Sequence, residues 1–178
     1  AYGCIKGMAD VEYVKRNDIK TLLNSGSIVN VGNGMSPDIE KIIDMEPDAV
    51  LVSPFENSGG YGKLDELHIP LVECADYMEP SPLARAEWMR FYGMLVGKEA
   101  EADSLFIQVE KAYDSIKARA SNSKVKPRVM MDLPSSNVWY VPGGQSTIGQ
   151  MIADAGGDYC FADIKKGGSS AMAVEAVV

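Results

Sequence analysis

The chain has 178 residues, of which 46% are apolar, and a formal net charge of −8 at pH 7. This is enough for one domain, or two small lobes, with a hydrophobic core. No basic stripe is visible, so a nucleic acid is excluded as a partner, because phosphate binding requires clustered lysine and arginine. A positively charged protein surface suits this acidic chain better.

No stretch has the roughly 18 apolar residues of a membrane span. The first residues, AYGCIKGMADVEYVK, lack the basic and apolar regions of a signal peptide, so we expect any signal to lie upstream of this chain. The three cysteines, Cys4, Cys74 and Cys160, are far apart and lack CxxC spacing. Their spacing argues against a zinc site and against a dense disulfide framework.

The first part of the chain predicts a helix followed by a strand. Apolar spacing predicts a helix over 18–26, and 27–32 is typical of a strand. A second helix is expected to begin with Ser36 as its cap and Pro37 in its first position, and to stop before Pro47. This order of elements is the first sign of an α/β architecture.

Acidic side chains lie on one flank of that second helix. Glu40 and Asp44 are spaced i and i+4, away from the face that carries Ile39, Ile42 and Ile43. The strand that follows, 49–53, is almost wholly apolar, as a strand covered on both faces of a parallel sheet would be.

The helix–strand unit then repeats, which predicts a parallel sheet. Ligands of such sheets lie beyond the carboxyl ends of the strands. The elements concerned are a helix over 62–68, a strand over 69–76, and the strand-end loops 54–62 and 77–82.

Residues 83–122 are the longest helical stretch, broken only near Gly97. Its second part carries an apolar stripe at steps of four, three and four, made of Leu105, Val109, Ala112 and Ile116. The polar break 121–127 is the best domain boundary. The elements expected after it are a strand over 128–133, a loop over 134–144 with a short hairpin element, a helix over 146–157, a strand or turn over 158–163, a loop over 164–170 and a helix over 171–178.

Sequence motifs for catalysis are absent. The chain has no Walker sequence, no GxGxxG after a strand and no GxSxG elbow. Its single histidine, His68, precedes a strand, which excludes a multi-histidine metal cage and leaves a catalytic triad little to use. We therefore expect no catalytic and no metal-ligating residues.

Four stretches resemble the class III substrate-binding proteins of bacterial ABC importers, which take up iron–siderophores, haem and cobalamin. SPDIEKIIDMEPDAVLVSP and KLDELHIPLVEC are similar to two successive helix–strand units of the family's first lobe. MLVGKEAEADSLFIQVEKAYDSIKARA looks like the start of its long interlobe helix, and WYVPGGQSTIGQMIADAGGDYCFAD like the opening of its second lobe. The resemblance covers about residues 27–178 and rests on the order and spacing of these pieces.

The resemblance implies an α/β fold of two βα lobes with parallel sheets, joined by a long helix. It predicts a partial first lobe over 1–82, a helical segment with the interlobe helix over 83–122 and a partial second lobe over 123–178. Family members usually have more chain on both sides of this region, so the fold is expected to be incomplete and truncated at both ends.

The resemblance also places a metal chelate between the lobes, a ferric siderophore, haem or cobalamin, with no other cofactor. Aromatic side chains suit such flat or ring-bearing ligands. Alternatively, Trp139 and Tyr140 pack within their own hairpin, while Trp88 is expected in the core. The predicted ligand-binding residues are Asn33, Phe55, Glu56, Tyr61, Tyr77, Met78, Trp139 and Tyr140.

The family docks on its permease through one exposed glutamate per lobe, and Glu40 and Glu175 match these positions. The resemblance implies a location in the periplasm or at the cell surface, with a lipid anchor upstream. Three alternatives stay open: a tetrapyrrole metal chelatase, an α/β interaction domain without a ligand, and a zinc or manganese importer protein, which the single histidine disfavours.

Overall fold

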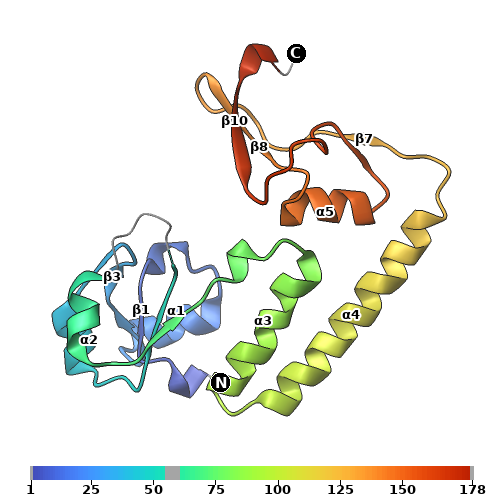
Figure 1. Ribbon diagram of the computed structural model, residues 1–178. Helices are drawn as coiled ribbons and strands as arrows, with labels where there is room; N and C mark the ends of the chain where they lie inside the picture. Colours follow the sequence, from blue (N-terminus) through green and yellow to red (C-terminus); the bar gives the residue numbers. More distant parts are fainter. Residues whose placement is uncertain (1, 55–60, 177–178) are drawn as a thin grey trace. The chain divides into compact units, whose positions relative to one another are not determined.

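The computed structural model describes residues 2–54 and 61–176. It divides into two compact units, Ala1–Cys74 and Ala75–Val178, and each is described by itself (Figure 1). The division predicted from the sequence, with boundaries after residues 82 and 122, stays a prediction.

The described part of the first unit contains short paired strands and two α-helices. The helices are α1 (Asn17–Asn24) and α2 (Ile39–Asp44), and the 3-10 turns are η1 (Tyr2–Cys4), η2 (Val11–Tyr13) and η3 (Gly62–Leu67). The strands pair as β1 (Gly7–Met8) parallel to β2 (Val29–Asn30), β3 (Gly32–Asn33) antiparallel to β4 (Ser36–Pro37), and β5 (Val50–Val52) parallel to β6 (Leu71–Glu73). The parallel pairing of β5 with β6 confirms the repeated helix–strand units that the sequence predicts.

Val31, Ile42 and Leu64 form the buried centre of the first unit, and Val50 and Val52 of β5 pack against it. The sequence predicts that β5 is covered on both faces, but Leu51 is 54% exposed. Successive residues of a strand point to opposite faces, so the core covers only the face that carries the two valines.

Helix α2 begins two residues later than predicted. Ser36 and Pro37 lie in β4, paired with Asn33 and Gly32, so the prediction that Ser36 caps the helix is wrong. Asp38 is the N-cap, and its side chain accepts a hydrogen bond from the backbone N–H of Lys41 at 3.2 Å. The hairpin holds the two preceding residues extended, and this overrides their preference for a helix start.

The second unit combines a helix pair with short strands (Figure 1). α3 (Pro82–Leu95) packs against the 23-residue α4 (Glu99–Ser121). The remaining elements are η4 (Asp76–Met78), β7 (Arg128–Val129), β8 (Val138–Pro142), α5 (Thr147–Asp154), β9 (Asp158–Tyr159), β10 (Ser169–Ala173) and η5 (Val174–Ala176). β7 and β9 are parallel, and β8 and β10 are antiparallel.

Residues 169–173 form a strand, so the predicted helix is wrong for residues 171–173 and the predicted loop is wrong for 169–170. β10 pairs along the whole of β8, from Ser169 opposite Pro142 to Ala173 opposite Val138. Alanine is a strong helix former, but backbone pairing with a neighbouring strand outweighs that local preference. The described residues that follow, Val174–Ala176, form the 3-10 turn η5, and residues 177–178 lie outside the described residues.

A glycine-rich turn connects β8 to α5. The N–H groups of Gly143 and Gly144 donate to the carbonyls of Gly168 and Ile164 at 2.9 and 2.8 Å. Ser146 is buried, accepts a hydrogen bond from Gly149 N–H at 3.1 Å and thereby caps α5. The turn therefore packs closely against the backbone of residues 162–168.

A polar cluster joins α4 to α5. The carboxylate of Asp154, only 12% exposed, accepts hydrogen bonds from Tyr113 Oη at 2.7 Å and Gln150 Nε2 at 2.9 Å, and Lys117 Nζ lies 3.0 Å from it. Burial by itself would raise the pKa of Asp154, but these donors outweigh it and hold the pKa below its ordinary value. Burial, together with the hydrogen bond to Asp154, raises the pKa of Tyr113 to about 12.

These contacts predict a loss of stability at alkaline pH. The pKa of Tyr113 is raised above its ordinary value of about 10, so its contribution is complete below pH 10 and disappears as the pH rises towards 12. Urea unfolding at several pH values between 9 and 12 should show this fall. Tyr113→Phe should show a smaller fall than the wild-type chain, and an equal fall would contradict the assignment.

Candidate functional site

Tyr61 lies at the carboxyl edge of the β5–β6 pair, where parallel α/β sheets carry their ligands. Its hydroxyl donates to Glu73 Oε1, at the end of β6, at 2.9 Å, and its backbone N–H donates to Asp65 Oδ2 at 2.9 Å. The hydroxyl and the N–H are thus both engaged, and the ring also packs on the core of the first unit. The predicted residues Phe55 and Glu56 lie outside the described residues.

Asn33 organises the turn between β3 and β4. Its side-chain N–H donates to Asp10 Oδ1 at 3.0 Å, and its Oδ1 accepts from Met35 N–H at 2.9 Å. The other oxygen of Asp10 accepts from Gly34 N–H at 3.1 Å. Asn33 is therefore exposed, and its side chain also stabilises the turn through these hydrogen bonds.

In the second unit, Tyr77 and Met78 are both exposed on η4. Trp139 and Tyr140 are neighbours on β8, so they point to opposite faces of the hairpin. Trp139 is half-buried and donates from Nε1 to the carbonyl of Met131 at 3.2 Å, whereas Tyr140 is exposed. Trp139 is thus held by a residue that precedes the hairpin, and the ligand-binding role of Trp139 and Tyr140 stays a prediction.

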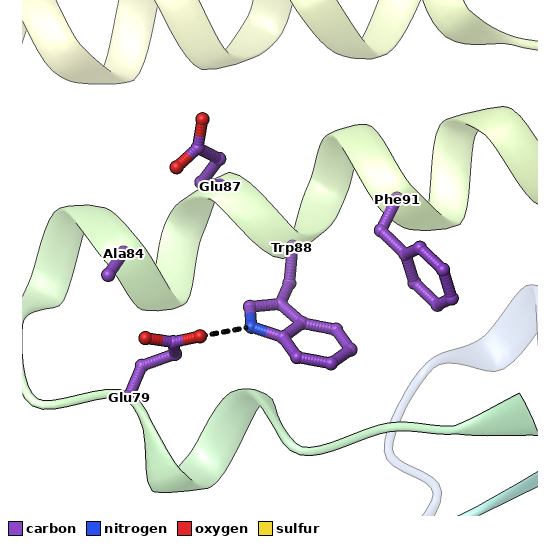
Figure 2. Close-up of a pocket in the computed structure, with 5 residues that line it drawn as sticks. All are labelled: Glu79, Ala84, Glu87, Trp88 and Phe91. Atoms are coloured by element: carbon purple, nitrogen blue, oxygen red, sulfur yellow. Dashed lines mark hydrogen bonds between the residues drawn. The ribbon is translucent and has the colours of Figure 1, made fainter.

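A shallow open hollow of about 270 Å³ lies along α3, lined by Glu79, Ala84, Glu87, Trp88 and Phe91. Figure 2 shows the carboxylate of Glu79 at the indole nitrogen of Trp88, and Glu87 pointing away from that ring. Trp88 Nε1 donates to Glu79 Oε1 at 2.9 Å. The rings of Trp88 and Phe91 meet edge to face, with centroids 5.4 Å apart.

The loop that carries Glu79 is fixed at several points. The carbonyl of Glu79 accepts a short hydrogen bond from Thr147 Oγ1 at the start of α5. Asp76 accepts from Tyr92 Oη at 3.3 Å and lies 3.4 Å from Arg85 Nε. The hollow is therefore bounded by a loop tied to both α3 and α5, with aromatic edges and one carboxylate. This chemistry suits a flat apolar group that carries a hydrogen-bond donor.

A family model described as "Periplasmic binding protein" matches residues 8–178. The chain belongs to this family. The resemblance seen in the sequence is confirmed, and so is the class III fold, with its parallel strand pairs and long helix.

Three relatives illustrate the similarity. An uncharacterized lipoprotein of Methanocaldococcus jannaschii is 32% identical over 162 residues, covering 89% of this chain and 38% of its own length. Among solved structures, a possible iron-binding (periplasmic solute-binding) protein from Staphylococcus epidermidis has a TM-score of 0.70 at 21% identity, covering 97% of this chain and 64% of that chain. The periplasmic heme-binding protein RhuT from Roseiflexus sp. RS-1, in apo form, has a TM-score of 0.66 at 23% identity, covering 98% and 72%. The chain thus spans about two fifths of the curated relatives' length.

Within this periplasmic binding protein, the sequence did not single out Glu79 as a candidate and assigned Trp88 to the core. Trp88 is half-buried and lines the hollow instead. The i, i+3 spacing of Trp88 and Phe91 on a predicted helix, next to the loop 77–82, was the available signal. Spacing alone does not distinguish a core face from a pocket wall.

The two glutamates predicted to dock on a permease are both exposed. Glu40 lies in the first turn of α2. Glu175 lies in η5, directly after β10. Both side chains are accessible to a partner, and their docking role stays a prediction.

Residues 2–54 and 61–176 contain neither a metal-binding cluster nor a helix that could span a membrane. In that part of the chain no three side chains of the His, Cys, Asp and Glu types lie together as a metal site. Over the same ranges no helix has the length and apolar character that crossing a membrane requires. His68 is exposed in a turn with a left-handed backbone, and its Nδ1 lies 2.9 Å from the carbonyl of Glu66.

Proposed function

We propose that this chain is the substrate-binding component of an ABC importer for a metal chelate, and that it is not an enzyme. The family match over residues 8–178 carries this proposal. The names of two solved relatives, one possibly iron-binding and one heme-binding, support iron or a tetrapyrrole in the ligand class. The lipoprotein relative supports a lipid-anchored location at the cell surface or in the periplasm.

The chemistry of the described residues fits a ring-bearing ligand. Tyr77 and Tyr140 are exposed aromatic side chains, and the hollow adds Trp88 and Phe91. Aromatic rings bury a large apolar area with little loss of rotamer freedom. The predicted set from Asn33 to Tyr140 therefore stays our ligand-binding proposal, with the hollow as an addition.

Ligand binding can be tested by tryptophan fluorescence, because the chain has only two tryptophans. The protein should be titrated with haem, cobalamin and ferric desferrioxamine. We expect one of them to quench emission saturably, in the variant Trp88→Phe, which retains Trp139, as well as in the wild type. Calorimetry that detects no binding of any of the three would overturn the proposal, as would turnover of porphyrin with ferrous ion.

Permease docking predicts a separable phenotype. Glu40→Lys should reduce uptake in cells about 10-fold or more, because close charge pairs across an interface steer encounter and fix register. Ligand affinity in vitro should be unchanged, since Glu40 is exposed on α2. Asp44→Lys, on the same helix and also exposed, is the matched control and should transport normally. A fall in ligand affinity for Glu40→Lys would show that the docking assignment is wrong.

A further inference from the structure

One flank of α4, beside its buried face, carries an apolar stripe exposed to solvent. Its members are Leu105, Val109, Ala112 and Ile116, called the α4 stripe below. Leu105 is 56% and Ile116 60% exposed, and the other two are exposed as well. The inner face of the helix is used differently: Ala102 and Phe106 are buried, and Arg90 of α3 lies over the Phe106 ring at 4.2 Å. The stripe is therefore not part of the unit's own core.

The α4 stripe has the pattern of a helix-pairing seam. Its steps of four, three and four place Leu105 and Ala112 at one heptad position and Val109 and Ile116 at the other. The stripe covers 11 residue steps, or about 16 Å of helix. Exposed apolar faces that continue over several turns mark interaction sites more often than single exposed apolar residues do.

The stripe is self-complementary when a second copy runs antiparallel to it. A two-fold axis between Val109 and Ala112 places Leu105 of one copy opposite Ile116 of the other, and Val109 opposite Ala112. A large side chain then meets a small one at the centre, and two large ones meet at each end. This alternation allows the helices to approach closely along the seam.

The charges of α4 favour the same orientation. Residues 99–110 contain four acidic and no basic residues, whereas 111–121 contain three basic residues and one acidic residue. An antiparallel pair places the acidic half of each helix beside the basic half of the other, while a parallel pair would place the two acidic halves together. Near each end, Glu101 of one copy approaches Arg119 of the other.

A second surface feature lies where the end of the partner helix would reach. An open hollow of about 470 Å³ at the start of α4 is lined by Ala100, Glu101, Ser104 and Leu105. Next to it, the last residues of α3 and the turn that follows expose further apolar side chains: Met94, Leu95 and Val96. The basic end of a second α4 would meet both an acidic side chain and apolar surface there.

We propose that the α4 stripe is the interface of a symmetric, antiparallel dimer of this chain. The seam alone is smaller than the roughly 1,200 Å² that stable complexes bury, so the dimer is weak and depends on the apolar turn beside it. The pairing does not depend on ligand binding or on an importer. An experiment can therefore disprove the dimer without affecting the proposed function, and an experiment that disproves the proposed function leaves the dimer untouched.

Analytical ultracentrifugation of the chain, from about 5 µM to about 500 µM, tests the dimer over the range expected for a weak interface. The weight-average mass should rise from the monomer towards twice that value. Leu105→Glu and Ile116→Lys should each weaken association at least 10-fold without altering the circular dichroism spectrum, because both side chains are exposed. Leu133→Glu, at a side chain 85% exposed outside α4, should associate as the wild type does.

Charge exchange tests the orientation. The Glu101→Arg variant by itself should be monomeric, and so should the Arg119→Glu variant, because a homodimer of either one brings like charges together. An equimolar mixture of the two variants should dimerise, since every contact becomes complementary again. A chain that stays monomeric throughout, or stripe variants that associate like the wild type, would overturn the proposal. A monomeric protein in which a cysteine placed at position 105 is protected from labelling would also overturn the proposal. Another segment of the same polypeptide would then cover the stripe.

Discussion

Gly144→Ala is expected to destabilise the second unit by more than about 3 kcal/mol, the range of severe packing clashes. A Cβ at Gly144 would overlap the carbonyl oxygen of Ala162 and lie 2.6 Å from its carbonyl carbon and 2.8 Å from its Cα. All three atoms belong to the backbone, so no flexible side chain can move aside. The 142–146 turn would have to separate from the 162–168 segment and lose the hydrogen bond from Gly144 N–H to Ile164.

Gly167→Ala is the matched control for this turn. Nothing lies within 4 Å of a Cβ built at Gly167, and its backbone is not in the left-handed region. Urea unfolding should give a midpoint close to wild type for Gly167→Ala and a much lower one for Gly144→Ala. Equal midpoints for the two variants would show that the turn does not pack as described.

Asp154→Ala is expected to cost about 2–4 kcal/mol of stability, as removing one partner of a buried hydrogen-bonded charge does. Three donors converge on this carboxylate, from Tyr113, Lys117 and Gln150. Two of them lie on α4 and the third on α5, so the substitution removes the polar contact between the two helices. Thermal unfolding followed by circular dichroism measures the loss.

Two further measurements isolate the role of Asp154. Asp114→Ala, at an exposed carboxylate on α4, should change stability by less than about 0.5 kcal/mol. Because the pKa of Asp154 is lowered, its contribution is present above the ordinary aspartate value and is lost as the pH falls through the lowered pKa. The difference between wild type and Asp154→Ala should therefore shrink at strongly acidic pH. A constant difference would contradict the charged cluster.

Elements with strong local signals were predicted well. The helical stretch predicted over 83–122 is present as α3 and α4, and the helix predicted over 146–157 is present as α5. Predictions failed where pairing with another segment decides the conformation. β4 holds Ser36 and Pro37 in a hairpin, and β8 draws residues 169–173 into a strand.

For the candidate site too, local features could be predicted from the sequence and contacts between distant segments could not. Strand-end loops could be located from the order of helices and strands, which brought Tyr61, Tyr77 and the 77–82 loop into view. The hydrogen-bond partners of the candidate side chains could not be predicted, because they come from other segments. Examples are Glu73 for Tyr61 and Met131 for Trp139. The pairing of Glu79 with Trp88 likewise depends on how the loop folds back along α3.

The sequence by itself determined the family, the α/β class and the long helix, because these depend on periodicity, spacing and the order of motifs. Tertiary structure decided which faces of those elements are covered. Leu51 and the α4 stripe have the composition of core residues but are exposed, since the described residues of their own units do not pack over them. Gly144 reads as a flexible turn residue, yet the space left by its missing side chain is filled by the backbone of Ala162. Burial depends on neighbours that are distant in the chain, and the local sequence does not identify those neighbours.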